Sequence, residues 1–560
     1  MSSKPKFTYD QWIYSRDQYL DWLSVFLENK KQDPIFLWRS FNLLYVTLLA
    51  KKDVEVENDW FKRINERING YSKPSSINLM SSQKFFIRFV FLFIYEYLKL
   101  ILYKIYFTNS DLLSSSADVY FHSLSSNLQT TKYGTYDRHF CNAPLTDIKF
   151  EKKAAYVVAL VMGLNDIKNF SKYSKEVKEK LNSLKRQSVL LNNYTSFSTI
   201  NEVYFSLFSS WRMFRKEARK LSFQKNFIIN NYSCADILIT EIEKSFLGEI
   251  QWSLIYGLSF QNWIQKEKIQ APVITYGETL SPMRPVYYFS KLVNPSILFL
   301  SIQHSTTSRN KMGLYHRKKE FMSAVNHELV DFKLLPDYYL VQGDQFREIS
   351  KEFYPLDRTA IIGCLKYDNI PFYKGKPAMN KKMGIDDQYF SKEEKVILIA
   401  PSVNDAASLI QLFKNPIFTN WRIILRPHPA NDVDKIREMV VQANNFVHIE
   451  VITDLSTADL FSVASLVVCG YSASCYEALI QSVSAIQYMN LQSIPLMEPD
   501  PEIPFFTSRE DFWEWFTKFD KAELNSDILK IADNITQKYF HKMDGCSSVR
   551  LWQFVRSLNN

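Results

Sequence analysis

Glycine is scarce in this sequence, and its scarcity excludes several classes of protein. The chain has only 13 glycines in 560 residues, well below the usual share of about 7%. Neither the G-x-G-x-x-G pattern of dinucleotide-binding proteins nor the G-x-x-x-x-G-K-[ST] pattern of P-loop proteins occurs. Those two kinds of nucleotide site therefore lose their main sequence support, and a collagen-like chain is excluded.

Cysteine is also sparse, and long basic runs are missing. None of the six cysteines forms a C-x-x-C pair, which argues against a zinc ribbon or a disulfide scaffold and fits a reducing cytoplasm. Histidines and acidic residues are too dispersed for a recognisable metal motif. The first ten residues lack the apolar core of a signal peptide. We therefore expect a cytoplasmic protein with no metal and no tightly bound cofactor.

The charge balance is mildly basic. Lysine and arginine number 68 and aspartate and glutamate 59, a net charge of +9. Without a concentrated basic patch, we expect no nucleic-acid partner. This balance suits a protein that binds an anionic substrate or works beside anionic lipid. Because 46% of the residues are hydrophobic, the chain can build large cores, and its length suggests two to four domains.

One long aromatic and aliphatic stretch, residues 83–107, carries five charged side chains. In a helix, four of these charges fall within about a third of the circumference: Lys84, Arg88, Glu96 and Lys99. A membrane-spanning helix would rarely carry so many charges. Two interpretations stay open: a helix lying on the inner face of an anionic membrane, or a buried helix with one wet stripe.

Two series of short apolar runs alternate with helix-like stretches. The first series comprises residues 155–162, 272–276, 297–303, 338–342 and 359–362, and the second comprises 395–400, 422–426, 448–452, 466–469 and 484–488. Strands that alternate with helices indicate parallel sheets. We predict an α/β protein with two Rossmann-like domains facing a cleft and an extra N-terminal helical region.

The predicted domain boundaries follow from the same two series. We expect a helical, membrane-associated region at 1–110, a first Rossmann-like domain for the acceptor at 111–365 and a linker at 366–394. A second Rossmann-like domain, for the nucleotide donor, follows at 395–510, and C-terminal helices complete the chain at 511–560.

Two motifs in the second series suit an anionic ligand, because ligands of open parallel sheets bind beyond the carboxyl ends of strands. The segment Arg426-Pro427-His428-Pro429 presents a guanidinium and an imidazole, which fit a phosphate; the alternative is a plain surface turn. Gly470-Tyr471-Ser472-Ala473-Ser474 joins a strand to a helix, as in backbone anion sites. Its alternative is a capping box between Ser474 and Glu477. A serine-hydrolase elbow would need a further glycine.

Three residues of the first series are candidates for a general base, which must be a carboxylate or an imidazole. We rank Glu278 first because it follows a strand, Asp137 second because it lies in a polar loop, and His304 third. Each has a structural alternative: Glu278 could pair with Arg284, for example, and His304 could cap a helix.

Taken together, these motifs resemble the GT-B glycosyltransferases of bacterial surface carbohydrate biosynthesis. The R-P-H-P and G-Y-S-A-S segments are similar to the HP and serine motifs of bacterial sialyltransferases and Kdo transferases, which use CMP-activated sugars. Residues 276–278 together with 302–305 resemble a stretch of surface carbohydrate biosynthesis proteins. Residues 336–343 with 361–363 and 396–401 are similar to CDP-glycerol glycerophosphotransferases of teichoic-acid synthesis.

The resemblance covers roughly residues 115–510. It implies transfer of a sugar, such as Kdo or a sialic-acid relative, from CMP to a surface polysaccharide or glycolipid precursor without a metal. Donor-binding residues would be Arg426, His428, Gly470, Tyr471, Ser472, Ser474 and Glu477, and the base would be Glu278 or Asp137. The alternatives are a CDP-glycerol-type polyol-phosphate transferase and an inactive binding module.

Overall fold

The computed structural model of the chain describes most of the sequence. The described residues are 8–29, 59–107, 117–131, 134–141, 143–150, 152–184, 187–276, 283–304, 309, 335–368, 394–402, 405–428, 431–443, 446–455, 457–470, 472–489, 498–521 and 528–558.

The first domain is built on a sheet of seven parallel strands in the order β11-β10-β9-β8-β1-β4-β5. These strands are β1 (Val119–Leu124), β4 (Ala154–Ala159), β5 (Ser188–Leu190), β8 (Val273–Tyr276), β9 (Phe299–Ile302), β10 (Tyr338–Val341) and β11 (Thr359–Ile361). The strands are buried along nearly their whole length, as expected for a parallel sheet covered on both faces. Among its helices are α5 (Leu164–Lys168), α6 (Phe170–Asn182), α11 (Met283–Val293) and α13 (Asp344–Ser350).

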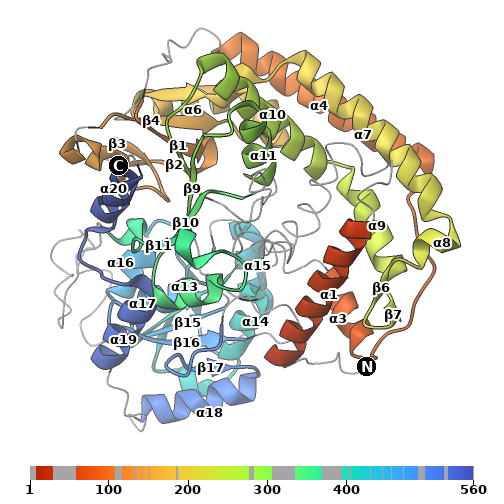
Figure 1. Cartoon of the computed structure of the whole chain (residues 1–560). Helices are drawn as coiled ribbons and strands as arrows, with labels where there is room; N and C mark the ends of the chain where they lie inside the picture. The colour runs from red at the N-terminus through yellow and green to blue at the C-terminus, as the bar shows by residue number, and fades with distance from the viewer. Residues whose placement is uncertain are drawn as a thin grey trace.

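The second domain has a sheet of six parallel strands in the order β14-β13-β12-β15-β16-β17. They are β12 (Val396–Ala400), β13 (Arg422–Leu425), β14 (Ile449–Val451), β15 (Leu466–Cys469), β16 (Ser484–Tyr488) and β17 (Phe505–Phe506). Its helices include α14 (Ala406–Ile410), α15 (Val433–Ala443), α16 (Thr457–Phe461) and α17 (Ser474–Leu479). Two such parallel sheets, one per domain (Figure 1), confirm the predicted α/β fold of the GT-B class.

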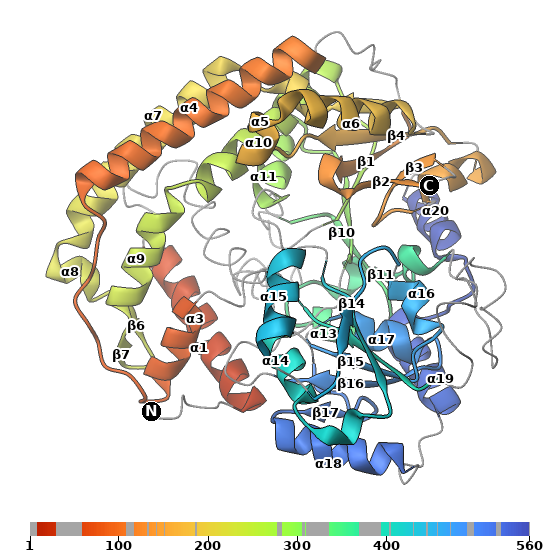
Figure 2. The same cartoon turned by 180° about the vertical axis from the view of Figure 1, so that it is seen from behind.

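Helices from two parts of the sequence form an arc beside the two domains (Figures 1 and 2). They are α1 (Tyr9–Asn29), α3 (Asp59–Ile68), α4 (Ser82–Phe107), α7 (Phe197–Ala218), α8 (Leu221–Gln224), α9 (Ala235–Ser245) and α10 (Glu249–Glu267). The predicted helix at 83–107 is present as α4. None of the helices in the described residues is long and apolar enough to cross a membrane.

Helices α4 and α7 pack antiparallel through an aromatic seam. The ring of Phe85 stacks on that of Trp211 with centroids 3.8 Å apart. Further along, Phe89 meets Tyr204 at 5.2 Å and Tyr97 meets Phe197 at 5.1 Å. Aromatic pairs contribute beyond the area they bury, so this seam fixes which side of α4 faces inward.

The C-terminal helices divide between the two domains. Helix α18 (Arg509–Asp520) packs on the second sheet, and α19 (Ile528–Phe540) places Tyr539 between Phe346 of α13 and Tyr476 of α17. The last helix, α20 (Ser547–Ser557), returns to the first domain. There the indole N–H of Trp552 donates to the carbonyl of Ala143 at 2.7 Å. The chain therefore passes between the domains twice.

Candidate functional site

The carboxyl ends of the two sheets meet around a cavity of about 50 Å³. From the first domain it is lined by residues that follow β9, β10 and β11, and from the second by the residues at the start of α17. The polar lining comprises His139, Gln303, His304, Gln342, Lys366 and Glu477. Because parallel sheets bind ligands beyond the carboxyl ends of their strands, this position makes the cavity the candidate active site.

Asp137 holds a tight turn at one wall of the site. It ends β3 (Gly134–Asp137), which pairs with β2 (Leu128–Thr131) in a hairpin. One carboxylate oxygen accepts the Ser123 hydroxyl at 2.5 Å, and the other accepts the amides of His139 at 2.7 Å and Phe140 at 3.2 Å. The side chain is fully buried, and burial raises the pKa of Asp137 to about 6 although these bonds oppose it. Both oxygens are thus engaged in shaping the turn.

The turn presents His139, which the sequence analysis did not select. Its imidazole lies over Tyr276 with ring centroids 4.4 Å apart and meets His304 edge-on at 5.4 Å. Arg138 donates from Nε to His139 Nε2 at 3.2 Å. Burial lowers the pKa of His139 to about 2, and the positive charges of His304, Arg138 and Lys366 add to the effect. The ring is therefore neutral at pH 7.

An ion pair crosses from one domain to the other beside these rings. Glu477 accepts from the Lys366 ammonium at 2.5 Å and from the Tyr367 hydroxyl at 2.8 Å. The alternative of a capping box between Ser474 and Glu477 is wrong, because Ala473 is the N-cap of α17 and makes no side-chain cap bond. With only six residues, α17 also has a small dipole.

The loop that carries Ser472 and Ser474 begins at Gly470, which lies against the side chain of Asp405. A Cβ atom at Gly470 would lie 1.4 Å from an oxygen of Asp405, so only glycine fits there. Asp405 itself accepts the amide of Ser402 at 2.7 Å and its hydroxyl at 2.6 Å. In the same loop, Ser472 donates its hydroxyl to that of Ser474 at 3.0 Å. The S-x-x-D spacing of Ser402 and Asp405 is the sequence pattern from which these two hydrogen bonds could have been predicted.

The R-P-H-P segment follows β13, next to β12 in the second sheet. Arg426 donates from one guanidinium nitrogen to the carbonyl of Thr453 at 2.9 Å, so it also ties β13 to the end of β14. Burial lowers the pKa of His428, and the positive charge of Arg138 lowers it further. The charge of Arg138 in the first domain therefore acts electrostatically on His428 in the second. Since β13 and β15 flank β12, His428 and Gly470 start from strand ends about 10 Å apart.

Two of the predicted site residues, Glu278 and Tyr471, lie outside the described residues, as does the alternative ion pair of Glu278 with Arg284. Of the predicted residues, His304 and Glu477 line the cavity, and Asp137 holds the turn that carries the lining residue His139. The cavity lining does not include the other described donor candidates, which are Arg426, His428, Gly470, Ser472 and Ser474. Within the described ranges, no cluster of three histidine, cysteine or acidic side chains could hold a metal ion.

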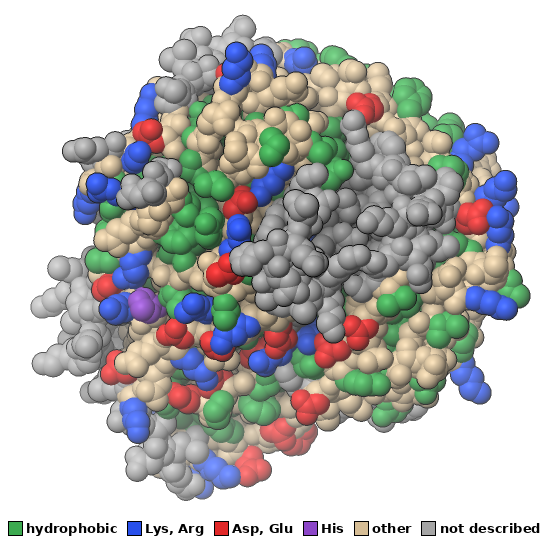
Figure 3. Space-filling view, viewed as in Figure 1, with side chains coloured by type: hydrophobic (Ala, Val, Ile, Leu, Met, Phe, Trp, Pro, Cys, Tyr) green, Lys and Arg blue, Asp and Glu red, His purple; other side chains and the backbone are tan. Residues whose placement is uncertain are grey.

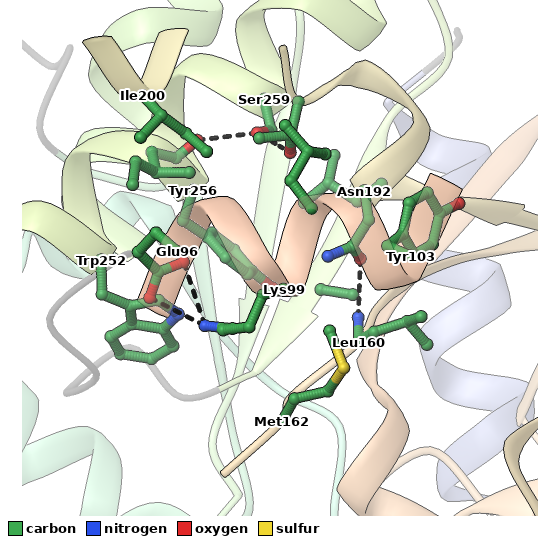
Figure 4. Close-up of a pocket in the computed structure, with 15 residues that line it drawn as sticks. Glu96, Lys99, Tyr103, Leu160, Met162, Asn192, Ile200, Trp252, Tyr256 and Ser259 are labelled. Atoms are coloured by element: carbon green, nitrogen blue, oxygen red, sulfur yellow. Dashed lines mark hydrogen bonds and ion pairs between the residues drawn. The ribbon is translucent and has the colours of Figure 1, made fainter. Parts of the chain in front are cut away.

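A second cavity, of about 60 Å³, lies between α4, α10 and the carboxyl ends of β4 and β5. Figure 4 shows its lining: the Lys99 ammonium pairs with Glu96 at 2.9 Å, and the Leu160 amide donates to Asn192 at 2.8 Å. This volume holds a few water molecules, and the polar groups of Lys99, Glu96 and Asn192 already pair with other residues of the lining.

Comparisons with known proteins found similar solved structures at low identity. No protein-family model matches the chain, and no curated protein does. Among solved structures, UDP-GlcNAc 2-epimerase from Neisseria meningitidis is 11% identical with a TM-score of 0.42, covering 79% of this chain and 99% of its own. A glycosyltransferase from Rickettsia africae is 8% identical with a TM-score of 0.43, covering 79% and 99%. The wall teichoic acid polymerase TagF is 11% identical with a TM-score of 0.40, covering 85% and 96%.

Proposed function

We propose that the chain is a glycosyltransferase that moves a sugar from a CMP-activated donor to a surface-polysaccharide or glycolipid precursor. The observation that carries this proposal is the cavity between the carboxyl ends of two parallel sheets, which His139, His304 and Lys366 of the first domain line together with Glu477 of the second. Neither domain alone contains all of these groups. A transfer reaction needs such a shared site, because its two substrates bind separately and must react with each other.

The donor phosphate fits the side of the cleft that carries His428 and Arg138. A guanidinium and an imidazole can both donate to phosphate oxygens, and the Ser472 and Ser474 hydroxyls stand on the same sheet edge. The distance of about 10 Å between the strand ends suits a nucleoside monophosphate laid along the edge. When the bond from the sugar to the phosphate breaks, negative charge grows on the departing CMP. Arg138 and a protonated His428 would stabilise it.

The acceptor hydroxyl would lose its proton to the imidazole of His304, because the low pKa of His139 makes that neighbouring ring a poor base. Its oxygen forms a bond to the anomeric carbon of the donor sugar while the bond from that carbon to the phosphate oxygen breaks. CMP leaves with the electron pair, and the hydroxyl proton passes to the imidazole and then to solvent. Asp137 acts here as a positioning residue, because its own oxygens already accept three hydrogen bonds. Glu278 remains a candidate for the same role.

A donor screen with purified protein tests this proposal. The protein is incubated with CMP-Kdo, CMP-sialic acid, CDP-glycerol or UDP-GlcNAc, and released nucleotide is separated by chromatography. We expect CMP from one of the CMP-sugars, with no release from UDP-GlcNAc. CMP released from CDP-glycerol alone would overturn the assignment in favour of polyol-phosphate transfer, in which a phosphorus–oxygen bond breaks. Failure to bind or turn over any nucleotide would identify an inactive binding module.

Substitutions then locate the activity in the cleft. We expect His428→Ala and Arg138→Ala each to lower donor turnover by about 10²-fold, the usual scale for loss of an electrostatic stabiliser. Arg426→Ala should lower turnover too, but its bond to the Thr453 carbonyl makes a check of folding necessary. The matched control is His448→Ala, since His448 is exposed at the opposite end of the second sheet. Equal loss in the control would contradict the site.

A further inference from the structure

Helix α4 carries an unbroken apolar stripe on its outer side. The stripe comprises Ile87, Phe91, Ile94, Leu98, Ile101 and Ile105, which are between 40% and 66% exposed. Their spacing alternates between four and three residues, so they form one line along the helix. At 26 residues the helix is about 39 Å long. A patch of this length on a described surface marks an interaction site.

The stripe cannot turn inward, because the opposite side of α4 is already occupied. The aromatic seam with α7 buries Phe85 and Phe89, and Leu100, Tyr103 and Phe107 are buried further along the helix. Figure 2 shows α4 along the rim of the molecule, in front of α7. The exposed position of the stripe is therefore a property of the packed fold.

The exposed charges of α4 itself are all positive. On its two sides stand the exposed cations Lys84 and Arg88 and, near the other end, Lys104. The one acid of α4, Glu96, points inward and pairs with Lys99 (Figure 4). On or just after the neighbouring helix α7, Arg212, Lys216 and Arg219 are exposed, Lys220 pairs with Glu217 at 2.6 Å, and Glu202 is an exposed acid. Figure 3, drawn in the view of Figure 1, shows hydrophobic and Lys or Arg side chains on the right-hand rim together with a few Asp or Glu side chains.

We propose that α4 binds the surface of an anionic lipid bilayer, with its stripe at the boundary between headgroups and acyl chains. Apolar side chains enter that boundary while the flanking cations meet lipid phosphates, as amphipathic helices do at membranes. The inference rests on α4 alone and holds whatever reaction the cleft performs. It selects the interfacial interpretation of residues 83–107 over the fully buried one.

A second copy of the chain is a poorer occupant of the stripe. Two-fold partners present the same surface to each other. An antiparallel pair centred on the stripe would place Arg88 beside Lys104 of the other copy, because both lie eight residues from its midpoint. No exposed acid on α4 offsets this repulsion. A bilayer containing anionic lipid supplies the missing counter-charge.

Co-sedimentation of the full chain with vesicles tests the proposal. We expect binding to vesicles that contain phosphatidylglycerol, weaker binding as salt rises, and little binding to phosphatidylcholine alone. The triple variant Ile87→Ser, Ile94→Ser and Leu98→Ser should bind about 10-fold more weakly or worse, because it removes apolar area from the bilayer. The double variant Lys84→Glu and Arg88→Glu should lose binding mainly at low salt.

The matched control is the double variant Val441→Ser and Phe446→Ser, which removes exposed apolar side chains from the second domain and should bind like wild type. Light scattering of each variant reports the oligomeric state, and circular dichroism reports folding. Undiminished vesicle binding by the triple variant would overturn the proposal, as would a wild-type dimer that this variant converts to monomers. Donor turnover in solution should be unchanged in the triple variant, which separates this test from that of the cleft.

Discussion

The ammonium of Lys366 lies 2.5 Å from a carboxylate oxygen of Glu477, and this contact joins the turn after β11 to helix α17. The same oxygen accepts the hydroxyl of Tyr367, which is buried. One carboxylate of the second domain thus satisfies two groups of the first at the edge of the candidate site. This contact fixes the position of one domain against the other at the edge of the candidate site.

Glu477→Ala should lower the thermal midpoint of unfolding. The variant leaves the buried Tyr367 hydroxyl without its acceptor, which costs about 1–3 kcal/mol, whereas the exposed Lys366 ammonium regains water. Differential scanning calorimetry measures the shift. Glu514→Ala is the control, because its pair with Lys518 at 2.7 Å is solvent-exposed and should contribute little. Equal midpoints for the two variants would contradict the role of Glu477.

Asp137 can be tested as a positioning residue by comparing two substitutions. Asp137→Asn keeps an oxygen that can accept the His139 and Phe140 amides, so most of the turn and most of the turnover should survive. Asp137→Ala removes the acceptors and should lower both stability, by about 1–3 kcal/mol, and turnover. Steady-state kinetics with parallel melting curves distinguishes the roles. A base would lose about 10²-fold or more in both variants.

Donor binding should take up protons. In the free protein, burial and the nearby charge of Arg138 lower the pKa of His428, and burial with neighbouring cations lowers that of His139. A bound phosphate brings negative charge, which raises both pKa values. The affinity for CMP should therefore rise as pH falls, by up to about tenfold per pH unit for each proton taken up.

Isothermal titration calorimetry in buffers of different ionisation enthalpy measures this uptake directly. His428→Ala should reduce the number of protons taken up, whereas His448→Ala should leave it unchanged. Proton release on binding would contradict the placement of the phosphate beside His428.

His122 makes folding stability depend on pH. This residue of β1 is fully buried against the Tyr256 hydroxyl, and burial lowers the pKa of His122 to about 3. In the unfolded chain the pKa is about 6.5, so between these values the unfolded state holds a proton that the folded state lacks. The contribution of His122 is therefore complete above about pH 6.5 and falls by about 1.4 kcal/mol per pH unit as pH drops toward 3.

The variant His122→Gln, which can still bond Tyr256, isolates this effect. Wild type should lose more of its melting temperature than the variant between about pH 7 and about pH 5.5. Because other titrating groups are common to both proteins, parallel melting curves would argue against a buried neutral His122.

The sequence predicted the strands better than the contacts between distant residues. All ten predicted strand segments lie in the two sheets, since buried parallel strands are continuous apolar runs. Strand β1 escaped prediction because His122 and Ser123 interrupt its apolar pattern, and β17 has only two residues.

The site was less accessible to prediction, because its partners come from far along the chain. Glu477 matched a capping box, but Lys366, 111 positions earlier, supplies its actual partner. Asp137 was chosen as a carboxylate in a polar loop, yet its oxygens accept the Ser123 hydroxyl and two amides. His139 was overlooked because no spacing rule marks a lone histidine in a turn, and its packing on Tyr276 exists only in the folded sheet.

The return of α20 to the first domain ties the folding of this protein to the order of its synthesis. Trp552 packs near Phe121 and donates to Ala143, so the core that forms around the first strand is completed by residues that are made after the whole second sheet. While a ribosome is still adding the second domain, that core lacks one of its largest side chains. A chain truncated before residue 547 would keep its whole second sheet. Its first domain, however, would expose the aromatic surface that α20 normally covers, and chaperones and proteases recognise such surfaces.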